Sequence, residues 1–170
     1  MKPVAACALA LAVLAGAGCQ GPTGAVDRGA PAGCGLVEQR AVTGLLGEDV
    51  TVAALGNLRR LRGHGEPVVC TTTVTGSTDR YIRIHARHHP DPMDLPDHDC
   101  DAGRVVAGTP QEYAPACQQA VGSGGRTVLF DRHGEYVVRV TIGRADQNWG
   151  GDAEAALRLS RQLGARLTSS

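Results

Sequence analysis

Apolar residues recur at helical spacing near both ends of the folded part of the chain. Within residues 34–47 they repeat at four-residue steps, which predicts an amphipathic helix that ends at Gly47. Residues 152–167 show the same spacing and begin with Asp152, a residue typical of a helix N-cap. The apolar residues on that second face are Ala156, Leu159, Leu163 and Leu167. The pattern therefore predicts two helices that each bury one face.

Between these helices, apolar residues mostly alternate with polar ones, as in half-buried strands. Residues 68–74 are rich in Val and Thr, and residues 80–88 alternate clearly. Residues 126–144 predict a hairpin that turns at residues 132–134. Residues 49–62 change from strand to helix spacing, so we interpret their first half as an edge strand and their second half as a short helix. The predicted fold is α+β, with an antiparallel sheet of about four to five strands packed by N- and C-terminal helices.

Two segments interrupt this pattern. Residues 89–108 contain three prolines and five aspartates and are too polar and broken for a helix or a strand. Loops of this length in a compact domain commonly serve a function. Thr109 and Pro110 form a typical helix start, which predicts a helix to about Ala120 before the glycines of residues 122–125 end it. The length suits a single domain, which we place at residues 34–170.

Residues 1–18 have the composition of a secretory signal peptide. Lys2 precedes a short apolar stretch, and small residues lead up to Cys19. An apolar stretch this short does not span a membrane. Small residues before a cysteine fit the signal of a lipoprotein, whereas residues 15–17 also fit the Ala-x-Ala rule of a secreted protein. Residues 19–33, rich in Gly, Pro and Ala, are expected to form a flexible tether.

The cysteine count favours the lipoprotein interpretation. Cys7 leaves with the leader, and an odd number of cysteines then remains in an oxidising compartment. Acylation of Cys19 accounts for the odd one and would anchor the protein on the extracytoplasmic face of the cell membrane. The remaining cysteines can pair in more than one way, and we favour the pairs that tie neighbouring elements: Cys34 with Cys70, and Cys100 with Cys117.

Composition excludes several classes of function. The chain has 17 basic and 17 acidic side chains, whereas a nucleic-acid binder shows a concentrated basic stripe, so we expect no nucleic-acid partner. It has no G-x-S-x-G nucleophile elbow and no phosphate-binding loop with its lysine. We therefore expect no enzymatic activity and no cofactor. One Phe, one Trp and three Tyr make a small core, to which disulfides would add stability.

Short motifs of the chain resemble a known group of proteins. A tether is followed by Cys34-Gly35-Leu36-Val37 at the start of a helix that ends Leu45-Leu46-Gly47, then by Cys70 at a strand, and finally by a hairpin and an amphipathic helix. This order resembles the small actinobacterial lipoproteins of unknown function, which have a PsbP-like α/β sandwich. Two features depart from that group: Thr71 rather than Trp follows the second cysteine, and the last helix has no cysteine. The resemblance implies an envelope protein with no known reaction.

Histidines and aspartates gather between residues 85 and 101, and such side chains bind zinc and other divalent ions. His85 and His88 lie at strand positions that point to opposite faces, which excludes a site within the strand. A site in the following loop could use His88, His89 and His98 with an aspartate such as Asp99. A solvated acidic loop or a pH-responsive histidine patch explains the same residues.

Arginines favour a binding function. We expect Arg80, Arg83, Arg87 and Arg139 to share the outward face of the sheet if their two strands are neighbours. Such a face suits an acidic polymer, lipid headgroups or a protein partner. We therefore predict a membrane-anchored, monomeric, non-enzymatic binding domain that recognises an envelope protein or a small-molecule or lipid ligand. The alternative is a metal-binding or metal-sensing lipoprotein that uses the loop at residues 85–101.

Overall fold

The described part of the chain combines helices and strands in one fold. The computed structural model describes residues 30–90, 104–105, 117–148 and 150–169. The elements follow the order α1 (Gln39–Leu46), β1 (Val50–Leu55), α2 (Leu58–His64), β2 (Val68–Val74), β3 (Tyr81–His88), β4 (Arg104–Val105), β5 (Cys117–Val121), β6 (Gly124–His133), β7 (Tyr136–Arg144) and α3 (Asp152–Thr168). The predicted α+β class is confirmed.

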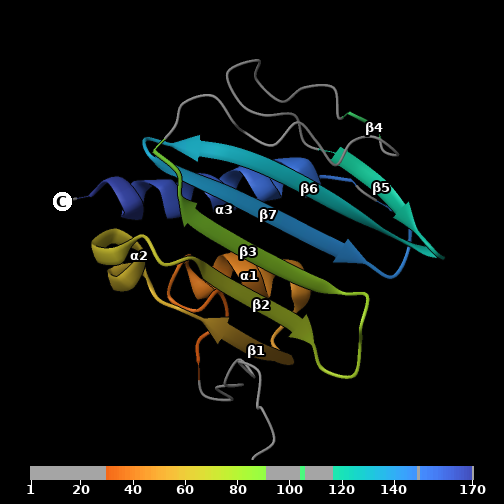
Figure 1. Cartoon of the computed structure of the whole chain (residues 1–170). Coiled ribbons are helices and arrows are strands. Elements are labelled where there is room, and N and C mark those ends of the chain that lie inside the picture. Colours follow the sequence, from red (N-terminus) through yellow and green to blue (C-terminus); the bar gives the residue numbers. More distant parts are fainter. Residues whose placement is uncertain (1–29, 91–103, 106–116, 149, 170) are drawn as a thin grey trace, which may run out of the picture.

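The strands form a single antiparallel sheet in the order β1-β2-β3-β7-β6-β5-β4 (Figure 1). The seven strands exceed the expected four to five because β4 and β5 extend the sheet beyond the predicted hairpin. The central pairing joins β3 to β7, with Arg83 opposite Thr141 and His85 opposite Arg139. This pairing brings together segments that are far apart in the sequence.

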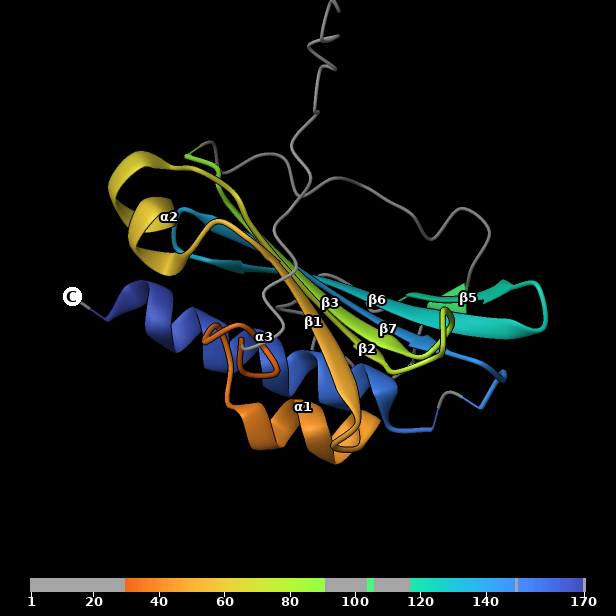
Figure 2. The same cartoon turned by 90° about the horizontal axis from the view of Figure 1, so that it is seen from below.

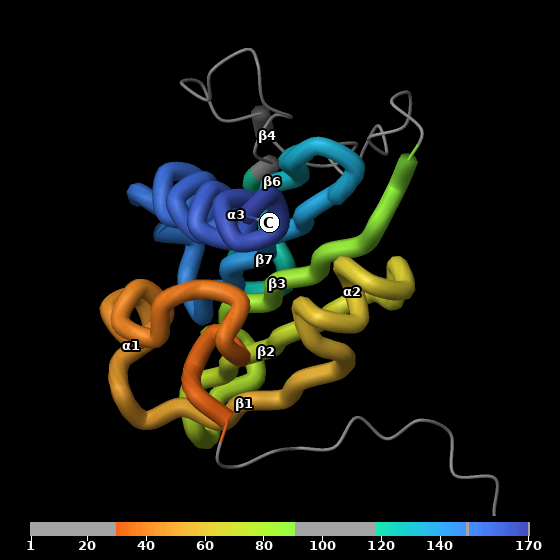
Figure 3. Tube along the Cα trace, turned by 90° about the vertical axis from the view of Figure 1, so that its left-hand side faces the viewer, coloured from red at the N-terminus to blue at the C-terminus, as the bar shows by residue number. Residues whose placement is uncertain are grey.

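The helices lie on one face of the sheet. Figure 2 shows α1 and α3 packed below the strands, while α2 lies at one end of the sheet. The chain before α1, red-orange in Figure 3, lies beside β1 and α1. Among the described elements, no helix covers the opposite face, which we call the open face.

The core lies between the sheet and the two helices. The alternate positions of β3 and β7 that face α3 are almost fully buried, as are the apolar positions of α3 itself. They include Ile82, Ile84, Val138, Val140, Ile142, Leu159 and Leu163. The apolar stripe predicted for residues 152–167 is thus confirmed.

The first helix is shorter than predicted. Helical geometry begins only at Gln39, because the chain turns at residues 31–36 and Cys34 has a positive φ of 53°. Its sulfur forms the predicted disulfide with Cys70 on β2. Ala32 is 4% exposed, so the folded domain begins before residue 34 and includes the last residues of the predicted tether.

The helix predicted from Thr109 is wrong at its C-terminal end. Residues 117–121 form β5, which pairs with β6 through a two-residue turn at Gly122 and Ser123. Gly122 has a φ of 60°, a geometry that suits a tight hairpin turn as well as it suits the end of a helix. Residues 106–116 lie outside the described residues, and the strand β4 falls within the predicted 89–108 loop.

Asp152 is not the N-cap of α3. Gly151 takes that position, and the buried carboxylate of Asp152 binds the guanidinium of Arg144 at the end of β7. Both oxygens of Asp152 accept hydrogen bonds from Arg144, so the contact is bidentate. The ion pair therefore fixes the start of α3 to the last residue of the sheet's central strand.

Candidate functional site

The open face carries a groove over the middle of the sheet. Its concave volume is about 370 Å³, and β2, β3, β6 and β7 line it. The lining residues are Val69, Thr71, Tyr81, Arg83, His85, Arg126, Arg139 and Thr141. We call this feature the open-face groove.

Strand register explains how these side chains come together. In an antiparallel sheet, residues directly opposite each other project from the same face. One cross-strand row runs from Thr71 through Arg83 to Thr141. In the next row on one side of it, His85 lies opposite Arg139. In the next row on the other side, Arg126 lies opposite Gly143. Three arginines from three neighbouring strands therefore surround Thr141.

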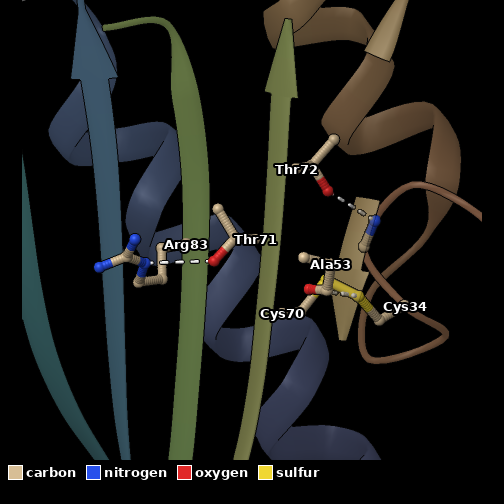
Figure 4. The surroundings of a disulfide bond; sticks show 7 residues. Cys34, Ala53, Cys70, Thr71, Thr72 and Arg83 are labelled. Carbon is tan, nitrogen blue, oxygen red and sulfur yellow. Dashed lines mark hydrogen bonds between the residues drawn. A yellow bond between two sulfur atoms is a disulfide. The ribbon is translucent and has the colours of Figure 1, made fainter. Parts of the chain in front are cut away.

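Arg83 is held by a neighbour across the strand pair. Its Nε donates a hydrogen bond to Oγ1 of Thr71 at 3.1 Å. The guanidinium lies 5.7 Å from the centre of the Tyr81 ring, within the range of a cation–π contact. In Figure 4 the terminal nitrogens of Arg83 extend away from Thr71 toward the neighbouring strand β7. Nε therefore positions the group, and the terminal nitrogens face the groove.

The other two arginines are also fixed. Nε of Arg126 donates to Oε1 of Gln119 on β5 at 2.6 Å. The guanidinium of Arg139 lies 5.2 Å from the centre of the Phe130 ring. Both side chains are only partly exposed. Because contacts hold these cations before any ligand arrives, binding would cost less side-chain entropy than with free surface arginines.

Tyr81 forms one end of the groove because Gly143 lies opposite it. A Cβ atom at Gly143 would lie 2.3 Å from Cε1 of Tyr81, so the ring rests directly on the glycine backbone. The close approach requires a residue with no side chain at this position. A flat aromatic wall therefore borders the arginines.

Arginines dominate the charge of the groove. Among the described residues, its lining includes three arginines and no Asp or Glu. Burial lowers the pKa of His85 below its ordinary value of 6.5, and the charges of Arg87 and Arg139 lower it further. His85 is therefore neutral near pH 7, mainly because its ring is partly buried.

The structure brings together most of the arginines that the sequence singled out, but not all of them. Arg83, Arg87 and Arg139 lie at open-face positions of neighbouring strands, as predicted. Arg80 does not, because its terminal nitrogen reaches the carbonyl oxygen of Leu46 at the end of α1. Arg126 was missed. It lies near the start of the predicted hairpin, and only its register opposite Gly143 places it over the groove.

The predicted metal ligands are dispersed or lie outside the described residues. His88 contacts Oε2 of Glu135 through Nε2 at 3.0 Å, on the side of β3 opposite to His85. The backbone N–H of His89 donates to the carbonyl of Glu135. His98, Asp99 and the rest of residues 91–103 are not described. Within the described ranges, no group of three or more His, Cys, Asp or Glu side chains is arranged to hold an ion.

A buried Ser-His-Asp cluster joins β6 to α3. Ser160 donates to Oδ2 of Asp131 at 2.8 Å, and Nε2 of His133 lies 3.1 Å from the same oxygen and 3.0 Å from the serine hydroxyl. In a catalytic triad the acid binds the other ring nitrogen, and the serine is accessible. Here Nε2 of His133 contacts both Asp131 and Ser160, and Ser160 is fully buried. The cluster therefore has a structural role, which is to connect α3 to the hairpin.

This cluster also affects the charge of Asp131. Burial acts to raise the pKa of the carboxyl, but hydrogen bonds from His133 and Ser160 act against burial and hold the pKa below its ordinary value. Close packing supports the contact, because a Cβ atom at Gly164 would lie 2.2 Å from Nδ1 of His133. Asp131 is therefore an ionised, fully buried anchor for α3.

The other sequence predictions lie mostly outside this part of the chain. The leader, Cys7, Cys19, Cys100 and the side chain of Cys117 lie outside what the structure describes, so the second predicted disulfide and the lipidation remain predictions. Among the described helices, none is long and apolar enough to cross a membrane.

Comparisons with protein-family models, with curated proteins and with solved structures find no match for this chain. The resemblance to actinobacterial lipoproteins therefore remains a prediction.

Proposed function

We propose that this protein is a non-enzymatic binding module that recognises an anionic ligand in the open-face groove. The supporting observation is the convergence of Arg83, Arg126 and Arg139 on one concave surface, whose described lining residues include no carboxylate. Like charges gathered in this way repel one another, and a bound anion relieves that repulsion. A group of neighbouring guanidinium groups in a groove therefore favours an anionic partner.

The hydrogen-bond pattern supports the same proposal. Within the described chain, the terminal nitrogens of Arg83 and Arg126 have no acceptor, while the Nε atoms of both side chains are held by neighbours. A planar guanidinium binds a carboxylate, sulfate or phosphate through two parallel hydrogen bonds. Two positioned guanidinium groups thus offer several donors to a single anion.

The size of the groove favours a ligand or a small part of a larger partner. A volume of about 370 Å³ lies near the lower end of the range for small-molecule sites. The groove is open rather than enclosed, and Val69 and Tyr81 add apolar surface at its border. A compact anionic group on a lipid, a metabolite or an envelope protein meets these conditions.

Anion-dependent stabilisation tests the proposed function. The thermal unfolding of the protein is followed in increasing pyrophosphate, with ionic strength held constant by chloride because screening weakens charge interactions. A ligand at a hundred times its dissociation constant adds about 2.7 kcal/mol, so Tm is expected to rise by several degrees. The double variant Arg83→Gln, Arg126→Gln should lose this specific rise.

The matched control is Arg59→Gln, which removes an exposed arginine on α2 away from the groove. Strongly hydrated anions stabilise most proteins by exclusion from their surfaces, so the difference between variants is the informative quantity. If the double variant responds as strongly as Arg59→Gln does, the groove is not the binding site.

We also propose that the module is a lipoprotein held on the extracytoplasmic face of the membrane through Cys19. The apolar leader and the odd cysteine support this location. Cys19→Ala should move the protein from the membrane fraction to the soluble fraction of expressing cells, while Cys7→Ala should leave it at the membrane. Equal membrane association of the wild type and Cys19→Ala would exclude lipid attachment at this residue.

A further inference from the structure

The arrangement of donors in the open-face groove restricts the kind of anion that fits. β7 lies between β3 and β6, so Arg83 and Arg126 are two strand spacings apart across the sheet and two residues apart along the strands. Their Cα atoms are therefore roughly 12 Å apart. Arginine side chains from both positions can therefore reach one group placed between them, above Thr141. A group that satisfies both guanidiniums must present several oxygen atoms in different directions.

A carboxylate is a poor match for this geometry. It has two oxygens in one plane and one negative charge, which a single guanidinium satisfies through a bidentate contact. A phosphate monoester has three terminal oxygens in a tetrahedral arrangement and carries close to two charges near pH 7. Two or three guanidiniums around one phosphoryl group balance that charge and that number of acceptors.

The border of the groove indicates what is attached to this group. The Tyr81 ring lies close to Gly143 at one end, and Val69 lies beside His85 in the adjacent row. These side chains offer apolar contact to a ring or an alkyl group but no charge. A ligand with a phosphoryl group at one end and an apolar or aromatic body at the other matches both parts of the groove.

We propose that the open-face groove binds a dianionic phosphate monoester, with its phosphoryl oxygens between Arg83 and Arg126 above Thr141 and its ester substituent against Tyr81. This inference rests on the proposed function, because it specifies the chemistry of the anion bound at the same site. The phosphoryl group can belong to a soluble metabolite or to the headgroup of a lipid, since both sources offer the same chemistry.

Binding of phenyl phosphate and phenyl sulfate to the purified protein tests the inference. The two probes share the ring and the tetrahedral head, but at about pH 8 the phosphate ester carries two charges and the sulfate ester one. We expect phenyl phosphate to bind about tenfold more tightly by calorimetric titration, because only the dianion balances both guanidiniums. Benzoate, with the same ring and a planar carboxylate, should bind more weakly than phenyl phosphate.

Variants assign the selectivity to the groove. Arg126→Gln should reduce the preference for phenyl phosphate over phenyl sulfate to less than about threefold. Without the Arg126 guanidinium, the second negative charge of the phosphate ester is no longer balanced. Arg59→Gln should keep the full preference. Equal or tighter binding of phenyl sulfate or benzoate to the wild type would overturn the inference while leaving the proposed anion site intact. No binding of any of the three anions would overturn both.

Two further probes distinguish the sources of the phosphoryl group. Glycerol 3-phosphate presents the monoester in solution, and phosphatidic acid in phosphatidylcholine vesicles presents it on a membrane. Binding of glycerol 3-phosphate supports a soluble ligand, and co-sedimentation with phosphatidic acid vesicles alone supports a lipid. Failure of both, with vesicles of phosphatidylcholine as the blank, would contradict the phosphate-monoester assignment.

Discussion

Gly143 shapes the groove because it has no side chain. The Tyr81 ring lies on its backbone, and Arg83 lies over the same ring. Gly143→Ala should displace Tyr81 and destabilise the protein by about 1–3 kcal/mol, the usual cost of adding a methyl group to a packed position. Urea denaturation measures this change in the free energy of unfolding.

Gly44→Ala is the matched control for this prediction. Gly44 lies within α1, and no atom of the described structure would contact an added Cβ within 4 Å. The substitution should stabilise the protein by about 0.5–1 kcal/mol, because alanine favours the helix over glycine. If Gly143→Ala proves as favourable as Gly44→Ala, Tyr81 does not depend on the close approach.

His85 makes stability depend on pH in a defined direction. Burial, followed by the charges of Arg87 and Arg139, lowers its pKa in the folded protein below 6.5. As pH falls through 6.5, the unfolded chain takes up a proton at this residue before the folded protein does. Stability should therefore fall from about pH 6.5 down to the folded pKa, and this contribution should change no further below it.

Two variants isolate this contribution in denaturation experiments across a pH series. His85→Gln should show a flatter dependence below about pH 6.5, because the titrating group is removed. Arg87→Gln should give an intermediate slope, because one of the two repelling charges is removed while burial remains. A His85→Gln variant that keeps the full wild-type slope would show that other groups govern it.

Two buried contacts, an ion pair and a hydrogen-bonded cluster, hold α3 against the sheet. The Arg144–Asp152 pair anchors the start of the helix, and Asp131 with Ser160 and His133 anchors its middle. The Asp152 side chain is 1% exposed and that of Arg144 is 26% exposed. Asp152→Asn should destabilise the protein by about 3 kcal/mol, because a partly buried guanidinium loses its counter-charge.

Glu154→Gln provides the comparison on the same helix. Glu154 pairs with Arg158 one turn later, and both side chains are largely exposed. Loss of this ion pair should lower the free energy of unfolding by less than about 0.5 kcal/mol, as is typical of exposed pairs. Chemical denaturation of the two variants gives the difference directly, and equal losses would mean that the buried pair does not anchor α3.

Most helices and strands could be predicted from the sequence, and β5 was missed for a physical reason. Apolar periodicity in the sequence located β2, β3, β6, β7 and α3, although burial alternates regularly only in the first two of these strands. It missed β5, because five residues that include two buried glutamines carry no apolar alternation. Pairing with β6 on one side and with β4 on the other makes this segment a strand.

In the whole molecule, the Cys34–Cys70 disulfide ties the chain before α1 to the second strand of the sheet. It closes a loop with a sequence separation of 36 residues. The double variant Cys34→Ala, Cys70→Ala should lose about 4 kcal/mol of stability in the loop-entropy account, less any relaxation of the native state. The loss is read from denaturation of the oxidised protein and its variant.

Reducing agent supplies the control and tests the remaining cysteines. If Cys34–Cys70 is the only stabilising bond, reduction should lower the stability of the wild type to that of the variant and leave the variant unchanged. A further loss in the reduced variant would support the predicted bond between Cys100 and Cys117. An oxidised variant as stable as the wild type would contradict a stabilising role for Cys34–Cys70.

The groove itself could be predicted only in part. Alternation along residues 80–88 placed Arg83 and Arg87 outward, and alternation along the predicted hairpin placed Arg139 outward, but neither pattern gave the register between strands. Arg126 and Tyr81 join the groove because Gly143 lies beside both, a relation between residues far apart in the sequence. Arg80 was misplaced although alternation puts it on the same side as Ile82 and Ile84, where its guanidinium reaches the carbonyl oxygen of Leu46.

The central claim is that the open face of the sheet binds an anion through Arg83 and Arg126. Titration of phenyl phosphate into the isotope-labelled protein, followed by NMR, tests it most directly. We predict shifts of the Nε–H signals of both arginines and of backbone signals along β3, β6 and β7. The signals of residues on the outer faces of α1 and α3 should not shift. Saturable shifts confined to the helices, or none at either arginine, would contradict the account.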